Sequence, residues 1–197
     1  MARKHLKALR LKENLRSKID GFRCAKFQPH QIGIHMRRTD MVCSGWAKIP
    51  KYHLITNAQV GKIDALAMRL LEEHATPGTC FFLACDDLLY QEKIRKMLEE
   101  SHCTVAIYGK KDPKGLRQTS LQDAICDLYL LAHCEKILRC GPSGFSRLAS
   151  QIGDTPMISV KTRPEWYARI QIRYGLLRNT IWFRRPWTAF IENMMPR

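Results

Sequence analysis

Residues 80–108, CFFLACDDLLYQEKIRKMLEESHCTVAIY, decide the fold of this chain. The stretch begins with a short apolar run over 80–84, which is typical of a buried strand. A helical pattern follows around 88–100, and residues 104–108 are again short, mostly apolar and compatible with a strand. A strand, a helix and a second strand in this order predict a parallel pair joined by a right-handed crossover.

The same alternation of strand and helix continues on both sides of this unit. Further strands are expected at 32–36, 137–138 and 157–160, and further helices at 60–71, 121–131 and 145–152. Thr119 and Gln122 are spaced as a capping box at the start of one of these helices. Because strands separated by helices pair in parallel, with helices on both faces, the sequence predicts a Rossmann-like α/β domain.

The chain is expected to contain three segments. Residues 1–30 form a basic amphipathic helix, residues 31–160 form the Rossmann-like domain, and residues 161–197 form a basic tail that interleaves aromatic side chains with arginines. The tail either contacts a membrane surface or a partner, or packs back on the domain. The apolar positions of the first helix recur at spacings of three and four, at Ala8, Leu11, Leu15 and Ile19.

The charge balance indicates an anionic partner. The 197 residues include 33 Lys and Arg against 18 Asp and Glu, a net charge of +15. Such a positive field attracts phosphates, nucleic acid or anionic lipid, and charge alone does not choose among them. No segment reaches the roughly 18 consecutive apolar residues of a membrane helix.

The cysteines and the first residues indicate the compartment. The eight cysteines include no C-x-x-C pair, which argues against a zinc cluster and against a secreted disulfide framework. The N-terminal residues lack the continuous apolar core of a secretory signal. We therefore expect a cytoplasmic protein with mostly buried, reduced thiols, with a peripheral place at a membrane as the alternative.

Polar side chains follow the ends of the predicted strands, where ligands bind in parallel sheets. A guanidinium group at such a position can grip a diphosphate through paired, charge-assisted hydrogen bonds. The alternative is an ordinary surface pair of arginines bound to Asp40. The polar residues at the strand ends are Arg37, Arg38, Asp86, Asp87 and Ser143.

Ser143 and Gly144 lie in a Gly-Pro-Ser-Gly turn just before a predicted helix. The free backbone N–H groups and the dipole at a helix N-terminus favour an anion. An ordinary N-cap role for the serine explains the turn equally well.

Three stretches together resemble one known family. Residues 32–40, IGIHMRRTD, resemble the H-x-R-R-x-D signature of the α-1,6-fucosyltransferases and their relatives. Residues 83–87, LACDD, look like the A-T-D-D element of that family, although a helix N-cap at either aspartate is an equal alternative. Asp127 and Ser143 stand sixteen residues apart, as do the helix Asp and the phosphate-binding Ser of the family.

The resemblance implies a fold and a set of roles. The fold would be the C-terminal, nucleotide-sugar-binding half of a GT-B glycosyltransferase. His35 and Asp127 would recognise guanine, and Arg37 and Ser143, with Gly144 beside them, would hold the β-phosphate of GDP-fucose. The reaction would be inverting and would need no metal and no cofactor, with Arg37 neutralising the leaving diphosphate. The residues expected to brace this site are Arg38, Asp40 and Asp87.

The chain departs from the family in two places. The family has a Lys directly after the signature Asp and a Glu a few residues later, whereas this chain continues Asp40-Met-Val-Cys-Ser-Gly45. The general base must then be another acid, for which Asp86 is the candidate. Only about thirty residues precede the signature, so we expect the acceptor-binding half of the family to be missing from this chain. A partner chain would then supply the acceptor site, or the basic loops and tail would replace it.

Three functions remain in competition at this point. The first is transfer of fucose from GDP-fucose to a hydroxyl of a glycan or glycoconjugate. The second is a non-catalytic GDP-sugar-binding module or inactive paralogue, which the missing base and acceptor half favour. The third is nucleic-acid binding, which the charge allows but which no recognised motif supports.

Overall fold

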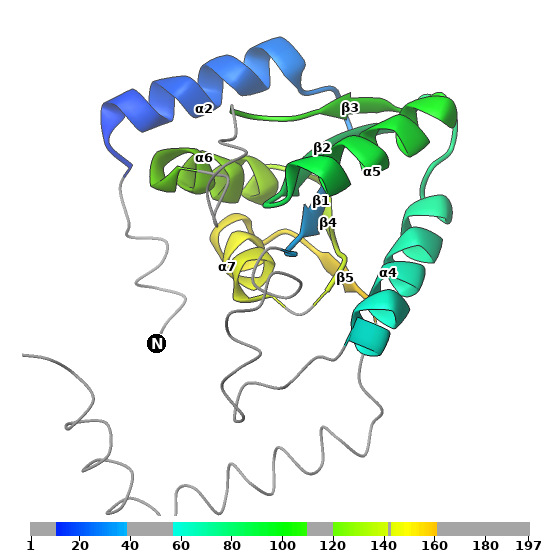
Figure 1. Ribbon diagram of the computed structural model, residues 1–197. Helices are drawn as coiled ribbons and strands as arrows, with labels where there is room; N and C mark the ends of the chain where they lie inside the picture. Colours follow the sequence, from blue (N-terminus) through cyan, green and yellow to red (C-terminus); the bar gives the residue numbers. More distant parts are fainter. Residues whose placement is uncertain (1–10, 39–56, 110–119, 142, 161–197) are drawn as a thin grey trace, which may run out of the picture. The chain divides into compact units, whose positions relative to one another are not determined.

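The computed structural model describes residues 11–38, 57–109, 120–141 and 143–160 (Figure 1). By its internal contacts the chain divides into residues 1–160 and residues 161–197, and the second unit, the predicted tail, lies outside the described residues. In the part that is described, no helix is long and apolar enough to cross a membrane. The elements follow in the order α2 (Glu13–Lys26), β1 (Ile32–Met36), α4 (Asn57–Glu72), β2 (Cys80–Cys85), α5 (Leu88–Glu100), β3 (Thr104–Ala106), α6 (Leu121–Ala132), β4 (Lys136–Arg139), α7 (Gly144–Gly153) and β5 (Met157–Ser159).

The five strands form one parallel sheet with β1 at its centre. The strand order is β3-β2-β1-β4-β5, and every neighbouring pair is parallel. In register, Ile34 of β1 lies between Leu83 of β2 and Leu138 of β4. Each crossover between parallel strands contains a helix, so the predicted Rossmann-like α/β fold is confirmed.

Helices cover both faces of the sheet (Figure 1). On one face, Phe81 and Leu83 of β2 join a core cluster with residues of α4 and α5. On the other face, Phe82 and Ala84 of the same strand join a second cluster with residues of α2, α6 and α7. Successive strand residues point to opposite faces, so the continuous apolar run of β2 is explained by burial on both sides.

The helix α2 belongs to the second of these clusters. It spans Glu13–Lys26, within the segment 1–30 that was expected to form an amphipathic helix, and residues 1–10 lie outside the described part. Leu15 and Ile19 are buried, as the predicted spacing requires. Phe22 makes an edge contact with Phe82, with 6.1 Å between ring centroids. The helix therefore stabilises the sheet through its apolar stripe.

The helix α6 approaches β1 closely at Gly33. A Cβ atom on this glycine would lie 2.9 Å from Leu131 Cδ2 and 3.1 Å from Cys134 Sγ, both closer than ordinary contacts. A side chain at this position would force the Leu131 methyl group and the Cys134 thiol to shift. Gly33 and His35 lie on the same face of β1, so the close approach also sets where α6 lies beside His35.

The cap of α6 differs by one residue from the prediction. The helix begins at Leu121 and its N-cap is Ser120, whose Oγ accepts a hydrogen bond from the N–H of Asp123 at 3.1 Å. The predicted cap, Thr119, lies outside the described residues. Ser120 and Asp123 repeat the spacing of Thr119 and Gln122, so two overlapping cap signals were present in the sequence.

The cysteines of the described residues are free thiols. Those at 85, 103, 126, 134 and 140 are buried, whereas Cys24 is exposed. Burial raises the pKa of Cys134 and of Cys140 to about 12, so both stay protonated at neutral pH. Cys43 is outside the described part of the chain.

Candidate functional site

The carboxyl ends of the three central strands lie side by side. His35 of β1 pairs with Ala84 of β2 on one side and with Arg139 of β4 on the other. The N–H of Cys140 donates a hydrogen bond to the carbonyl of His35 at 3.1 Å. The segments that follow β1, β2 and β4 therefore leave the sheet at one edge, where ligands of parallel sheets bind.

The first turn of α7 contacts the end of β1 at this edge. The rings of His35 and Phe145 are stacked, with centroids 4.9 Å apart and planes at 21°. Ser143 is the N-cap of α7, and its buried Oγ accepts a hydrogen bond from the N–H of Phe145 at 3.1 Å. Gly144, the first residue of the helix, is exposed. The stack thus places a helix N-terminus beside the last residues of β1.

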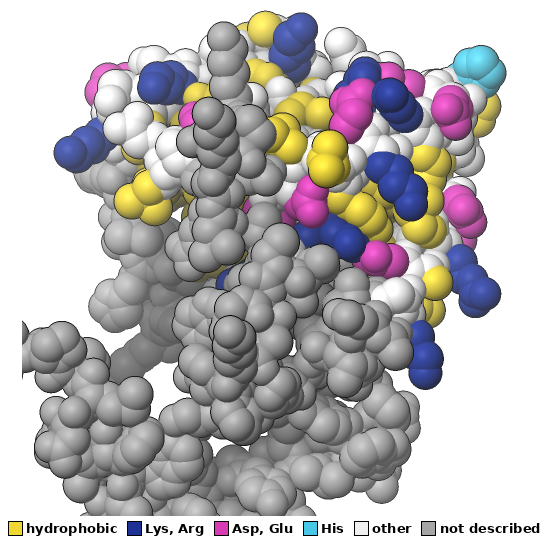
Figure 2. Space-filling view, viewed as in Figure 1, with side chains coloured by type: hydrophobic (Ala, Val, Ile, Leu, Met, Phe, Trp, Pro, Cys, Tyr) yellow, Lys and Arg dark blue, Asp and Glu magenta, His cyan; other side chains and the backbone are white. Residues whose placement is uncertain are grey.

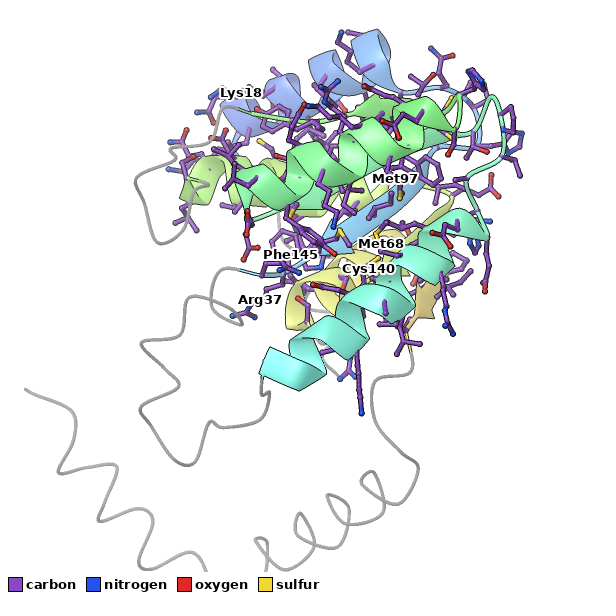
Figure 3. All side chains as sticks on the ribbon, turned by 45° about the vertical axis from the view of Figure 1, so that its right-hand side comes forward. Lys18, Arg37, Met68, Met97, Cys140 and Phe145 are labelled. Carbon is purple, nitrogen blue, oxygen red and sulfur yellow. The ribbon has the colours of Figure 1, made fainter. Side chains whose placement is uncertain are left out.

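Arg37 is exposed at the same edge. It comes two residues after His35, and Figure 3 shows its side chain directed away from the sheet, below Phe145. An exposed guanidinium close to a helix N-terminus combines a full positive charge with backbone N–H donors. This combination can bind a phosphate or a diphosphate.

Arg38 points the other way, toward α4 and α5. It forms an ion pair with Asp64 of α4, and its Nε lies 3.9 Å from a carboxylate oxygen of Asp87. Its guanidinium carbon lies 3.8 Å from the centroid of the Tyr90 ring. Burial lowers the pKa of Arg38, but the hydrogen bond and charge of Asp64 outweigh burial and raise it overall. Arg38 is therefore charged and already surrounded by protein groups.

The two aspartates after β2 both bind backbone N–H groups. Asp86 Oδ1 accepts a hydrogen bond from the N–H of Arg38 at 2.6 Å, which ties the end of β2 to the end of β1. Asp87 is the N-cap of α5, and its Oδ1 accepts from the N–H of Tyr90 at 3.0 Å. Of the two aspartates, Asp87 is therefore the one with the helix N-cap role that the sequence offered as an alternative.

Asp127 is buried on α6, on the face of the sheet that carries His35. The residue is 6% exposed, and α6 contacts both β1 and α7. Burial raises the pKa of Tyr108, and the negative charges of Asp123 and Asp127 add to that rise. A carboxylate in this position offers a recognition group on the same side as the first turn of α7.

The charges near this edge are mixed in sign. Figure 2 shows basic and acidic side chains interspersed with apolar ones over the face formed by α4 and α5. Among the described residues, no group of three His, Cys, Asp or Glu side chains could hold a metal ion. Asp40, expected to brace the site, lies outside the described residues.

Sequence patterns did not single out Asp64, Tyr90 or Phe145. Asp64 and Tyr90 contact Arg38, and Phe145 stacks on His35. Phe145 directly follows Ser143 and Gly144. This position next to the predicted anion site was the one feature of the sequence that could have indicated a role for Phe145 in the site. Asp64 and Tyr90 look like ordinary helix residues in the sequence.

Comparisons with known proteins identify the fold class. A scan against models of protein families and a search of curated proteins both find no match. Among solved structures, the chain is similar to the fucosyltransferase NodZ from Bradyrhizobium, with a TM-score of 0.50 and 24% identity over 77% of this chain and 46% of that chain. It is also similar to POFUT1 in complex with GDP-fucose, with a TM-score of 0.50 and 12% identity over 80% of this chain and 49% of that chain.

These similarities establish a fold shared with fucosyltransferases. The chain spans about half the length of the two solved structures. At 12% and 24% sequence identity the similarity shows that the backbones follow the same path. The roles of individual side chains must be argued from their positions in this structure.

Proposed function

We propose that this chain binds GDP-fucose or a related guanine nucleotide sugar at the carboxyl edge of its sheet. The observation that carries the proposal is the stack of His35 on Phe145, which brings the N-terminus of α7 to the end of β1 beside the exposed Arg37. The fold shared with POFUT1, whose solved structure contains GDP-fucose, supports the same ligand class.

Each proposed contact follows from the chemistry of the ligand. Arg37 forms charge-assisted hydrogen bonds with the β-phosphate, and Ser143 and Gly144 add the hydroxyl and N–H donors of a helix N-terminus. Asp127 accepts two hydrogen bonds from the N1 and N2 edge of guanine, an edge that adenine lacks. His35 completes the recognition of the base.

The reaction that this site supports best is inverting transfer of the sugar to a hydroxyl of a glycan or glycoconjugate. Arg37 stabilises the negative charge that develops on the leaving diphosphate, which lowers the barrier without a metal ion. Asp86 is the proposed general base, since it is an acid at the same edge. Arg38, Asp40 and Asp87 brace the site.

A second candidate is a binding module that holds the nucleotide sugar without transferring it. The observation that favours it is that the sequence after Asp40 lacks the Lys and Glu expected from the family resemblance. In this case a partner chain supplies the acceptor site, or no acceptor is bound. The proposed location is cytoplasmic, with the tail at 161–197 as a candidate contact with a membrane surface or a partner.

Incubation with GDP-fucose distinguishes the two candidates. The full chain is mixed with GDP-fucose, with and without a mixture of glycan acceptors, and released GDP is measured over time. Release that depends on acceptor supports the transferase. Binding of GDP-fucose without release in either mixture supports the binding module, and no binding refutes both.

A further inference from the structure

We propose that Asp64 and Tyr90 are positioning residues, which hold Arg38 and through it direct Arg37 toward the donor diphosphate. This inference rests on the proposed function, because it assumes that Arg37 contacts the ligand. It adds Asp64 from α4 and Tyr90 from α5 to a site otherwise built from the ends of β1 and β2 and from α6 and α7.

Arg38 is held by both its backbone and its side chain. Asp86 accepts the hydrogen bond from its backbone N–H, and Asp64 accepts one from its guanidinium. The Tyr90 ring lies against the face of the same guanidinium at 3.8 Å. Asp87, 3.9 Å away, adds a second carboxylate. We call these four residues the Arg38 clamp.

Asp64 and Tyr90, the two clamp residues that contact the guanidinium from the helices, are themselves fixed. The side chains of Asp64 and Tyr90 are hydrogen bonded to one another. Burial raises the pKa of Tyr90, and the charge of Asp64 raises it further, so the phenol stays protonated and donates to the carboxylate. Tyr90 also donates its backbone N–H to Asp87, the cap of α5. The clamp is therefore one connected network between two helices and a strand end.

The clamp acts on Arg37 through the peptide bond between the two arginines. This bond is planar, so fixing the backbone and side chain of Arg38 restricts the orientation of the preceding residue. An exposed arginine loses rotational freedom when it binds a ligand. A backbone that is already ordered reduces that loss, which is the usual gain from preorganisation.

The clamp also assigns different tasks to the two arginines. The carboxylates of Asp64 and Asp87 offset the charge of Arg38, which is only partly exposed, whereas Arg37 is exposed to solvent. In this arrangement the exposed Arg37 is the group that an anion at the edge of the sheet can reach, and Arg38 serves as an anchor. Loss of the Asp64 carboxylate would leave the charge of Arg38 less compensated, so a purely electrostatic model predicts tighter binding of the anion. The clamp predicts weaker binding instead, because Arg38 would no longer be held in place.

The test is a double-mutant cycle measured by calorimetric titration of GDP into the full chain. Asp64→Asn and Tyr90→Leu are each measured with Arg37 present and in the Arg37→Ala background. The control is Asp20→Asn, which makes the same change of charge in an exposed pair with Arg23 on α2. Unfolding temperatures of all variants are recorded in parallel.

We expect Asp64→Asn and Tyr90→Leu to weaken GDP binding about three- to thirtyfold when Arg37 is present, a range typical of coupled neighbours. Neither should weaken it further in the Arg37→Ala background, because the clamp acts through Arg37. Tyr90→Phe keeps the ring against Arg38 and should retain more affinity than Tyr90→Leu. Asp20→Asn should bind as the wild type does.

Two results overturn the inference while leaving the proposed function intact. The first is GDP binding by Asp64→Asn that is equal to or tighter than that of the wild type. The second is an equal loss in both backgrounds, which would mark a general structural effect. Absence of GDP binding by the wild type would overturn the proposed function and the inference with it. If Asp64→Asn fails to fold, Tyr90→Leu and Tyr90→Phe carry the same comparison.

Discussion

Replacement of Gly33 by alanine should destabilise the domain by forcing α6 away from β1. The added Cβ would lie 2.9 Å from Leu131 Cδ2 and 3.1 Å from Cys134 Sγ, where carbon atoms prefer about 3.5–4.0 Å. Leu131 is fully buried, so its side chain has little room to move. The strain falls on the strand that carries His35 and on the helix that carries Asp127.

The size of the effect follows from two opposing contributions. Overpacking of a buried contact costs about 1–3 kcal/mol. Replacing glycine also reduces the entropy of the unfolded chain, which offsets about 0.4–1 kcal/mol. The net loss should be about 1–2 kcal/mol, or roughly 2–8 °C in Tm for a domain of this size.

Gly61→Ala is the matched control. Gly61 lies within α4, and a Cβ atom there would meet nothing within 4 Å. Alanine in an exposed helix should stabilise by about 0.5–1 kcal/mol. Thermal and urea unfolding followed by circular dichroism should therefore shift in opposite directions for the two variants. A Gly33→Ala protein as stable as the wild type would refute the close packing of α6 on β1.

Three further predictions concern the cap of α6, the thiols and the response to pH. Ser120→Ala should lower the free energy of unfolding by about 1 kcal/mol through loss of the N-cap, and unchanged urea unfolding would contradict it. In the native protein a maleimide should label Cys24, whereas the buried Cys134 and Cys140 should react only after unfolding. Peptide mass spectrometry identifies the labelled cysteines. Labelling of Cys134 or Cys140 in the native state would contradict their burial. Burial raises the pKa of Tyr90 in the folded protein. As the pH rises above about 10, the phenol therefore ionises in the unfolded state before it does so in the folded state. The contribution of Tyr90 to the free energy of unfolding is complete below that pH and is lost above it. Urea unfolding at pH 9 and 11 should show a larger loss for the wild type than for Tyr90→Phe, and equal losses would refute this.

The sequence predicts the layout of the sheet because the signals are local. The helix expected around 88–100 is found over Leu88–Glu100, where an aspartate cap and apolar residues at helical spacing agree. The strand at 80–84 gains only Cys85. The strand expected at 104–108 ends earlier, at Ala106, and β3 is an edge strand that pairs with β2 alone.

The site is only partly readable from the sequence. The parallel sheet brings the polar residues at its strand ends, Arg37, Asp86 and Ser143, to one edge. The alternation of strands and helices in the sequence already predicted this. Their roles toward a nucleotide sugar remain predictions. The contacts of Asp64 and Tyr90 with Arg38 depend on how α4 and α5 cross the sheet, and no local pattern encodes such a crossing.

Calorimetric titration of GDP, with ADP as the comparison, tests the central claim most directly. It is carried out on the wild type, on Arg37→Ala and on Arg95→Ala, which removes the same charge from a partly exposed arginine paired with Glu92 and Glu99 on α5. We predict binding that is selective for GDP, weakened but still measurable in Arg37→Ala and unchanged in Arg95→Ala. Absence of GDP binding, equal binding of ADP, or equal loss in both variants would contradict a guanine-nucleotide site at the end of β1.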